Sequence, residues 1–128
     1  MLPNRIPTSF VLDPGNAANI VATFGGFSRH WIPSVGVGHV FVSHDGGETW
    51  TDVSGNLPDV PVESSIQWHH LLVVGTDVGV FATSAANPGS WERLGENLPG
   101  APVAAFTLTP EGNLLVAIHG RGIWELTS

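Results

Sequence analysis

Short apolar runs separated by glycine and proline recur along the whole chain. No stretch shows the 3.6-residue periodicity of an amphipathic helix. The pattern therefore predicts an all-β chain of many short strands joined by tight turns. The predicted strands are 8–12, 20–24, 38–43, 49–53, 62–68, 71–75, 79–83, 90–94, 103–107, 114–118 and 122–127.

The strands belong to an internal repeat. Residues 55–62, GNLPDVPV, recur as ENLPGAPV at residues 96–103, an offset of 41 from residue 55 to residue 96. FVLDP at 10–14 matches FTLTP at 106–110. Three units fit the chain, at about 6–58, 60–99 and 101–128, and the third unit ends after its third strand. A period of about 40–50 residues with four short strands per unit is typical of β-propeller blades.

Residues 43–50, SHDGGETW, follow the pattern S-x-D-x-G-x-T-W at every fixed position. Asp45 can accept hydrogen bonds from backbone amides of the turn, and Gly46 and Gly47 provide positive φ at little steric cost. Trp50 offers a large surface to bury. The segment therefore predicts a β-hairpin, whose five fixed positions are Ser43, Asp45, Gly47, Thr49 and Trp50.

This motif resembles the Asp-box, the hairpin signature of bacterial-neuraminidase-type repeats. The whole chain, taken as one domain of residues 1–128, looks like a bacterial Asp-box β-propeller of the sialidase and sortilin-like kind. The resemblance implies three blades, each a four-stranded antiparallel sheet, and an extracellular or periplasmic location. Residues 83–91 keep the turn and the Trp but lack the Asp. Functions differ widely within this fold, so the resemblance leaves the activity open.

Three blades do not close a ring, since propellers have about four to eight. An open arc would expose strand edges and apolar blade faces. We therefore expect self-association, most simply a homodimer with six blades. Further blades of a longer parent chain are the alternative. Residues 1–6 are a candidate for the missing outer strand of the third unit. The Trp side chains expected in the core between blades are Trp50, Trp68, Trp91 and Trp124.

The resemblance also implies where a ligand would bind. In propellers, the loops between second and third strands surround the channel mouth together with the crossings between blades. The candidate ligand residues there are Arg29, His30, Trp31, Asp77, His119 and Arg121. The 25–37 loop is long for a hairpin, as functional loops often are. A small-ligand or sugar site is one interpretation, and a covering loop whose Trp31 plugs the channel or an interface is the other.

Composition narrows the choice of partners. The chain has 4 Lys and Arg against 11 Asp and Glu, a net charge of −7, which disfavours binding to nucleic acids and to anionic membrane surfaces. It has no Cys, and no apolar run is long enough for a transmembrane helix. We expect no cofactor and no metal site. The first five residues lack the features of a signal peptide, so the chain is expected to stay inside the cell or to be a mature or excised piece.

An enzymatic function finds little support in the sequence. Sialidases, which the fold resembles, use a Tyr nucleophile and three Arg, but this chain has no Tyr and its Arg residues are scattered. A glycosidase needs two carboxyls at a set separation, and only Asp77, with Asp59 as a weaker second, lies on the site face. We therefore expect no catalytic residue. A non-catalytic interaction or scaffold module comes first, a carbohydrate-binding, lectin-like propeller second, and a fragment of a secreted glycoside hydrolase third.

Overall fold

The chain is all-β, as predicted. The computed structural model describes residues 7–13, 15–25, 38–95 and 98–127, and in this part the chain forms strands and no helix. Each predicted strand overlaps an observed one. The strands are β1 Pro7–Asp13, β2 Asn16–Phe24, β3 Val40–Ser43, β4 Thr51–Asp52, β5 Val62–Trp68, β6 Leu71–Thr76, β7 Gly79–Ser84, β8 Glu92–Arg93, β9 Val103–Leu108, β10 Leu114–Ile118 and β11 Gly122–Leu126.

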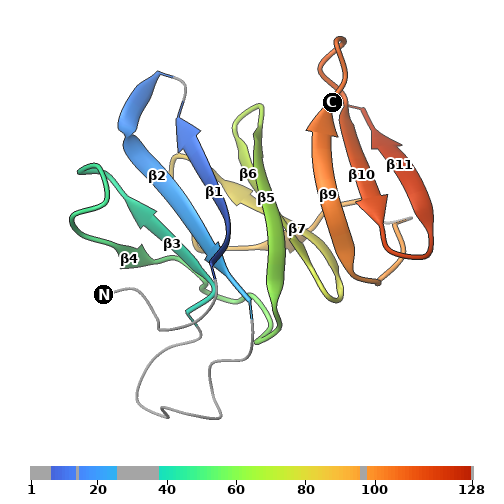
Figure 1. The fold of residues 1–128 in the computed structure, drawn as a ribbon, viewed down its shortest axis with the longest axis horizontal. Coiled ribbons are helices and arrows are strands. Elements are labelled where there is room, and N and C mark those ends of the chain that lie inside the picture. The colour runs from blue at the N-terminus through green and yellow to red at the C-terminus, as the bar shows by residue number, and fades with distance from the viewer. Residues whose placement is uncertain (1–6, 14, 26–37, 96–97, 128) are drawn as a thin grey trace.

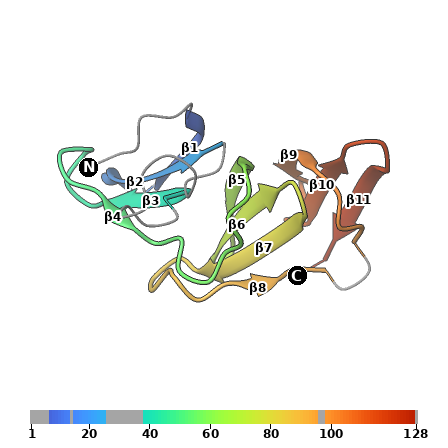
Figure 2. The ribbon, with the colours of Figure 1, turned by 90° about the horizontal axis from the view of Figure 1, so that it is seen from below.

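The strands form three antiparallel sheets that follow one another along the chain. Sheet one contains β1 to β4, sheet two β5 to β8 and sheet three β9 to β11, and each strand pairs with its sequence neighbour. The first strands lie together, since β5 contacts both β1 and β9. From there the sheets fan out (Figure 1), and the last strands β4 and β8 lie on the other side of the fan (Figure 2). Among the described residues no helix could cross a membrane.

All three first strands carry the same irregularity. The register shifts between Pro7 and Ser9 in β1 and between Val62 and Ser64 in β5. In sheet three it shifts opposite Ala117 and Ile118, whose partners in β9 are two residues apart. A bulge inserts one extra residue and increases the local twist. A bulge at the same place in each sheet means that the three units repeat in structure as well as in sequence.

The middle sheet is buried on both faces. Successive side chains of a strand point to opposite faces, so Leu72 and Val74 of β6 pack toward sheet one while Val73 packs toward sheet three. The β6 run Leu71–Thr76 is therefore apolar almost throughout, without an alternation of polar residues. By contrast, β10 in sheet three alternates between buried and half-buried positions. Both strands are apolar in sequence, so the burial of their side chains, and not the hydrophobic pattern, reflects how many neighbours each sheet has.

A hydrogen-bonded contact joins sheets one and two. The amide of Asn56, in the crossing after β4, donates to the backbone carbonyl of Trp91 and accepts from its N–H, at 3.0 and 2.7 Å. The indole of Trp91 donates to the carbonyl of Val53 at 2.9 Å. Trp91 is buried and packs in the core between these sheets. The first copy of the Asn-Leu-Pro segment therefore holds the Trp of the following sheet.

The prediction that four Trp side chains lie between sheets is right for two of them. Trp68 and Trp91 are buried. Trp50 is half-buried on the face of sheet one turned away from sheet two, and its indole bonds to Gly47 in its own turn. Trp124 is 37% exposed, so its placement in the core is wrong. It lies on β11, the outermost described strand of sheet three, with no further strand beside it.

The stability of Trp variants should follow this difference. Trp91→Ala removes a buried ring and its indole hydrogen bond to the Val53 carbonyl, and we expect a loss of about 3–5 kcal/mol in the free energy of unfolding. Trp50→Ala, at a half-buried position, should lose clearly less. Urea unfolding of both variants measures this. An equal loss in the two variants would contradict the described packing of Trp91.

Candidate functional site

The turn at residues 43–50 is held by its own side chains. The Ser43 hydroxyl donates to Asp45 at 2.7 Å and accepts from the Gly47 N–H at 2.9 Å. Asp45 also accepts from the backbone and the hydroxyl of Thr49. Gly46 and Gly47 have φ of 74° and 98°, which only glycine adopts easily. The side chains of Ser43, Asp45 and Thr49 therefore stabilise the turn from within, and the Gly46 N–H joins it to the Ala18 carbonyl of β2.

The charge of Asp45 is stabilised by this turn. The Thr49 hydroxyl and backbone N–H, followed by the Ser43 hydroxyl, donate to the carboxylate and hold the pKa of Asp45 far below its ordinary value of 3.8. Hydrogen bonds to the ionised form favour that form. Asp45 thus has a structural role that uses up its hydrogen-bonding capacity.

The candidate ligand residues at the opposite face lie apart from one another where they are described. Asp77 is half-buried in the β6–β7 turn, and His119 and Arg121 are exposed in the β10–β11 turn. Their backbones are anchored in equivalent ways, Asp77 to the carbonyl of Pro61 and His119 to that of Pro102. No hydrogen bond or ion pair joins the three side chains in the described part of the chain. The remaining candidates lie outside the described residues: Arg29, His30 and Trp31.

A buried His–Asp pair lies at the same end of sheet one. His39 Nε2 is 2.7 Å from Asp59 Oδ1, and both side chains are almost completely shielded from solvent. The N–H groups of His39 and Val40 also donate to the Ser54 hydroxyl. These contacts fasten the crossing after β4 to the start of β3. Asp59, considered as a second carboxylate for a glycosidase, is engaged in this pair.

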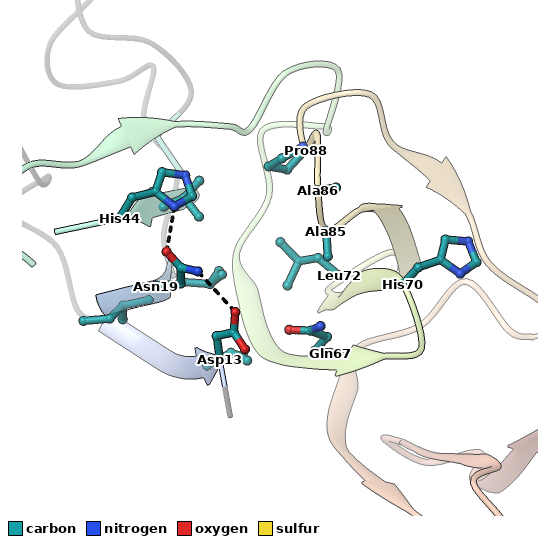
Figure 3. Close-up of a pocket in the computed structure, with 13 residues that line it drawn as sticks. Asp13, Asn19, His44, Gln67, His70, Leu72, Ala85, Ala86 and Pro88 are labelled. Atoms are coloured by element: carbon teal, nitrogen blue, oxygen red, sulfur yellow. Dashed lines mark hydrogen bonds between the residues drawn. The ribbon is translucent and has the colours of Figure 1, made fainter. Parts of the chain in front are cut away.

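A hollow opens between sheets one and two, at the end that carries the β1–β2, β3–β4 and β7–β8 turns. Its volume is about 410 Å³ (Figure 3). The floor is apolar, with Val21, Val42 and Leu72 among its residues. Polar side chains stand on the walls. The residues that line the hollow are Val11, Asp13, Asn19, Ile20, Val21, Val42, His44, Gln67, His70, Leu72, Ala85, Ala86 and Pro88.

A chain of hydrogen bonds runs along the sheet-one wall. Gly15 N–H donates to Asp13 Oδ1 at 2.9 Å, and Asn19 Nδ2 donates to Asp13 Oδ2 at 3.2 Å. Asn19 Oδ1 lies 2.9 Å from His44 Nδ1 (Figure 3). The Gly15 N–H, with the Asn19 amide next, lowers the pKa of Asp13 below 3.8. The wall therefore carries an ionised carboxylate near neutral pH.

The order of donors along this chain assigns the His44 tautomer. An ionised carboxylate only accepts, so the Asn19 amide nitrogen faces Asp13 and its oxygen faces His44. The Nδ1 of His44 then carries the proton, and Nε2 of the neutral ring is a hydrogen-bond acceptor. In Figure 3, this second nitrogen points away from Asn19. The opposite wall contributes the Gln67 amide, whereas the His70 ring points away from the hollow.

The hollow reflects a difference between sheets one and two at the last residue of the first strand, which is Asp13 in β1 and Trp68 in β5. Both strands have seven residues and a bulge after the first residue. The pairing of β1 has a second register shift between Leu12 and Asp13, which β5 lacks. Trp68 fills the space between sheets two and three, and its indole donates to the Gly112 carbonyl at 2.8 Å. Asp13 is too small to fill the equivalent space between sheets one and two.

The sequence contained a signal for this site. The repeat match between 10–14 and 106–110 has Asp13 opposite Thr109, and a charged residue at the end of an inward-facing strand is a departure from the repeat. Asn19, by contrast, has a counterpart in Asn113. His44 is exposed in its turn and bonds to Asn19. Comparing units position by position would have pointed to Asp13.

The chemistry available in the hollow is recognition by hydrogen bonds and charge. Within the described residues no group of three or more His, Cys, Asp or Glu side chains could hold a metal ion. The wall offers acceptors at Asp13 and His44 and amide donors at Asn19 and Gln67. No hydroxyl or thiol nucleophile is bonded to His44. The arrangement is suited to holding a ligand.

Comparisons with known proteins add information on the fold alone. No protein-family model matches the chain, and no curated protein matches it. The structure is similar to the crystal structure of the computationally designed Ika4 protein, with a TM-score of 0.63 and 12% sequence identity. The match covers 93% of this chain and 64% of that one, so this chain spans less than two thirds of its length.

The lowered pKa of Asp45 should make the stability of the folded chain depend on pH in the acidic range. Because its folded pKa is lowered, Asp45 stabilises the fold fully above about pH 3.8, and this contribution is lost as the pH falls toward the folded value. Asp45→Ala should therefore melt at a lower temperature than the wild type at neutral pH. The difference should shrink as the pH falls below 3.8, which thermal melting followed by circular dichroism would measure. A difference that stays constant would contradict the assigned bonds.

A larger loss of stability is predicted for the buried pair of His39 and Asp59. His39→Ala removes one partner of a shielded carboxylate and leaves a cavity beside it, so we expect a loss of about 3 kcal/mol or more in the free energy of unfolding. Chemical denaturation measures the loss. His44→Ala is the matched control, because His44 is exposed and should cost little. If the two variants lost equal stability, the pair would not be the anchor described.

Proposed function

We propose that the chain is a non-catalytic interaction module, a three-bladed arc of an Asp-box β-propeller that closes its ring with a second copy. Each sheet is one blade, and β1, β5 and β9 are the inner strands beside the central channel. The side-by-side arrangement of these first strands supports the proposal, as does the common bulge in all three. The turn at 43–50, which its own side chains stabilise, supports the Asp-box assignment.

One observation carries the proposal that the ring closes by association. The third strand of each blade has an equivalent apolar residue, which is Val40 in sheet one, Val80 in sheet two and Ile123 in sheet three. Val40 and Val80 are 0% and 1% exposed because a following sheet covers them, whereas Ile123 is 73% exposed. Burying Ile123 as its counterparts are buried requires a further sheet, and the described part of the chain contains none after sheet three.

The free face of sheet one is suited to supply that cover. Phe10 and Leu12 are each 60% exposed on the face turned away from sheet two. Their counterparts in β9, Phe106 and Leu108, lie on the face of sheet three that is turned toward sheet two. The free face of sheet one therefore corresponds to the face of sheet three that packs against the preceding sheet. Two copies related by a two-fold axis join both pairs of free faces and close a ring of six blades.

The same details favour binding over catalysis. The chain has no Tyr, the nucleophile of the sialidases that this fold resembles. Asp59 is buried against His39 and Asp45 is bonded within its turn, so neither carboxylate is presented to a substrate. The polar groups of the hollow are placed to recognise a ligand without a nucleophile beside them. An interaction module is the function that these features support best.

The assembly is tested by the mass of the native protein. Native mass spectrometry and light scattering at micromolar concentration should give twice 13.5 kDa. Ile123→Arg places a charge in the closed interface and should give a folded species of half that mass. Asn87→Arg adds the same charge to an exposed turn of the middle sheet, away from both free faces, and should leave the mass unchanged.

Two results would contradict the proposal. A well-folded wild-type monomer with a sharp melting transition would show that the exposed faces need no partner. A dimer that Ile123→Arg does not weaken would show that copies associate through another surface. Since obligate interfaces typically bury about 2,000 Å² or more, a change in mass should be unambiguous.

A further inference from the structure

Two equivalent spaces between neighbouring sheets have different contents. Between sheets two and three, the Trp68 ring fills the space and its N–H is bonded to Gly112. Between sheets one and two, Asp13 occupies the equivalent position and leaves a hollow of about 410 Å³. One space contains its own apolar ring with a hydrogen-bond donor. The other presents a carboxylate above an apolar floor.

We infer that this hollow binds an organic cation, an ammonium or guanidinium group carried on an apolar stem, as in a Lys or Arg side chain of a partner peptide. The cation would lie against Asp13, and the stem would lie on Leu72, Val21 and Val42. The inference rests on the proposed function only in treating the chain as a binding module. It does not depend on ring closure, because the hollow is formed within one chain.

The charge at the wall favours a cation. Asp13 accepts a hydrogen bond at Oδ1 from the Gly15 N–H and one at Oδ2 from the Asn19 amide, and the Asn16 N–H contributes as well. A carboxylate has about four lone-pair sites, so one stays available to a ligand. No ion pair to Asp13 occurs among the described residues. The hydrogen bonds from Gly15 and Asn19 hold the group ionised and in place. A charged donor from a ligand would therefore meet a preorganised acceptor without displacing a protein cation.

The other groups on the walls agree with this ligand. Neutral His44 adds a second acceptor at Nε2, oriented through Asn19. The hollow contains no Arg and no Lys, and the chain as a whole has a net charge of −7. An anion would be repelled by this net negative charge and would meet no Arg or Lys among the residues that line the hollow. The long side chains of Lys and Arg cover apolar surface with their methylene groups while the charged end keeps a polar partner.

The experiment is an NMR titration of the isotope-labelled full chain at low salt and mildly alkaline pH, which keeps imidazoles neutral. The probes are butylamine, butylguanidine and a blocked tripeptide with a central lysine. The same tripeptide with norleucine is the uncharged control. We expect the cations to shift the amide signals of Gly15, Val21 and Leu72, and we expect the affinity to fall with added salt. If the lysine peptide binds more tightly than butylamine, the natural ligand is a protein side chain. If the two bind equally, the natural ligand is a small amine.

Two variants of one residue test the site. Asp13→Asn keeps the size of the side chain and removes its charge, and it should weaken cation binding about tenfold or more. Asp13→Trp introduces the residue found at the equivalent position in sheet two, and it should abolish binding and raise the melting temperature. Glu111→Gln removes an exposed acid from the equivalent turn of sheet three and should change neither.

Other outcomes would overturn the inference. If the norleucine peptide bound as well as the lysine peptide, the hollow would be an apolar site in which Asp13 plays no part. If a methyl glycoside shifted the same signals and the cations did not, the site would recognise hydroxyl groups. Native mass spectrometry of the same samples reports assembly separately, so failure of cation binding and failure of ring closure are distinguishable.

Discussion

The middle sheet of this chain has two apolar faces, and each is covered by a neighbouring sheet. Leu72 and Val74 pack on one side and Val73 on the other. The crossing that brings Asn56 to Trp91 fixes how closely two sheets approach. How far a side chain is exposed follows from whether its face has such a neighbour. The β6 side chains are buried almost throughout, whereas Ile123 is exposed.

Most of the fold could be predicted because the information is local and repeated. The turns contain glycine and proline, the motif at 43–50 specifies its own hairpin, and the Asn-Leu-Pro segment marks each crossing. The predicted burial of Trp124 was wrong because the repeat gives equivalent positions but not equivalent neighbours. An equivalent position has an equivalent environment only if the same neighbours are present, and no strand lies beyond β11 among the described residues. Trp50 is half-buried, and its indole bonds to Gly47 in its own turn, whereas Asn56 bonds to the backbone of Trp91 from a neighbouring sheet.

The candidate site was harder to predict than the fold, because it depends on contacts between distant parts of the chain. Only Asp13 departs from the repeat, Asn19 and His44 give no signal along the sequence, and the antiparallel pairing of β1, β2 and β3 brings the three together. His39 was missed since a His within an apolar run gives no sign of its partner, Asp59, which lies 20 residues away. In a repeat protein, the useful signal is a position where one unit breaks the pattern of the others.

The contacts between sheets also determine how a disturbance spreads. The bonds of Trp91 to Asn56 and of Trp68 to Gly112 join neighbouring sheets across 35 and 44 residues. Arrays of this kind behave approximately as a sum of unit and nearest-neighbour terms. A change within β6 weakens two interfaces at once, whereas a change within β11 weakens one. Amide hydrogens of β6 should accordingly exchange with solvent last, and a single chain should open from its outer sheets inward.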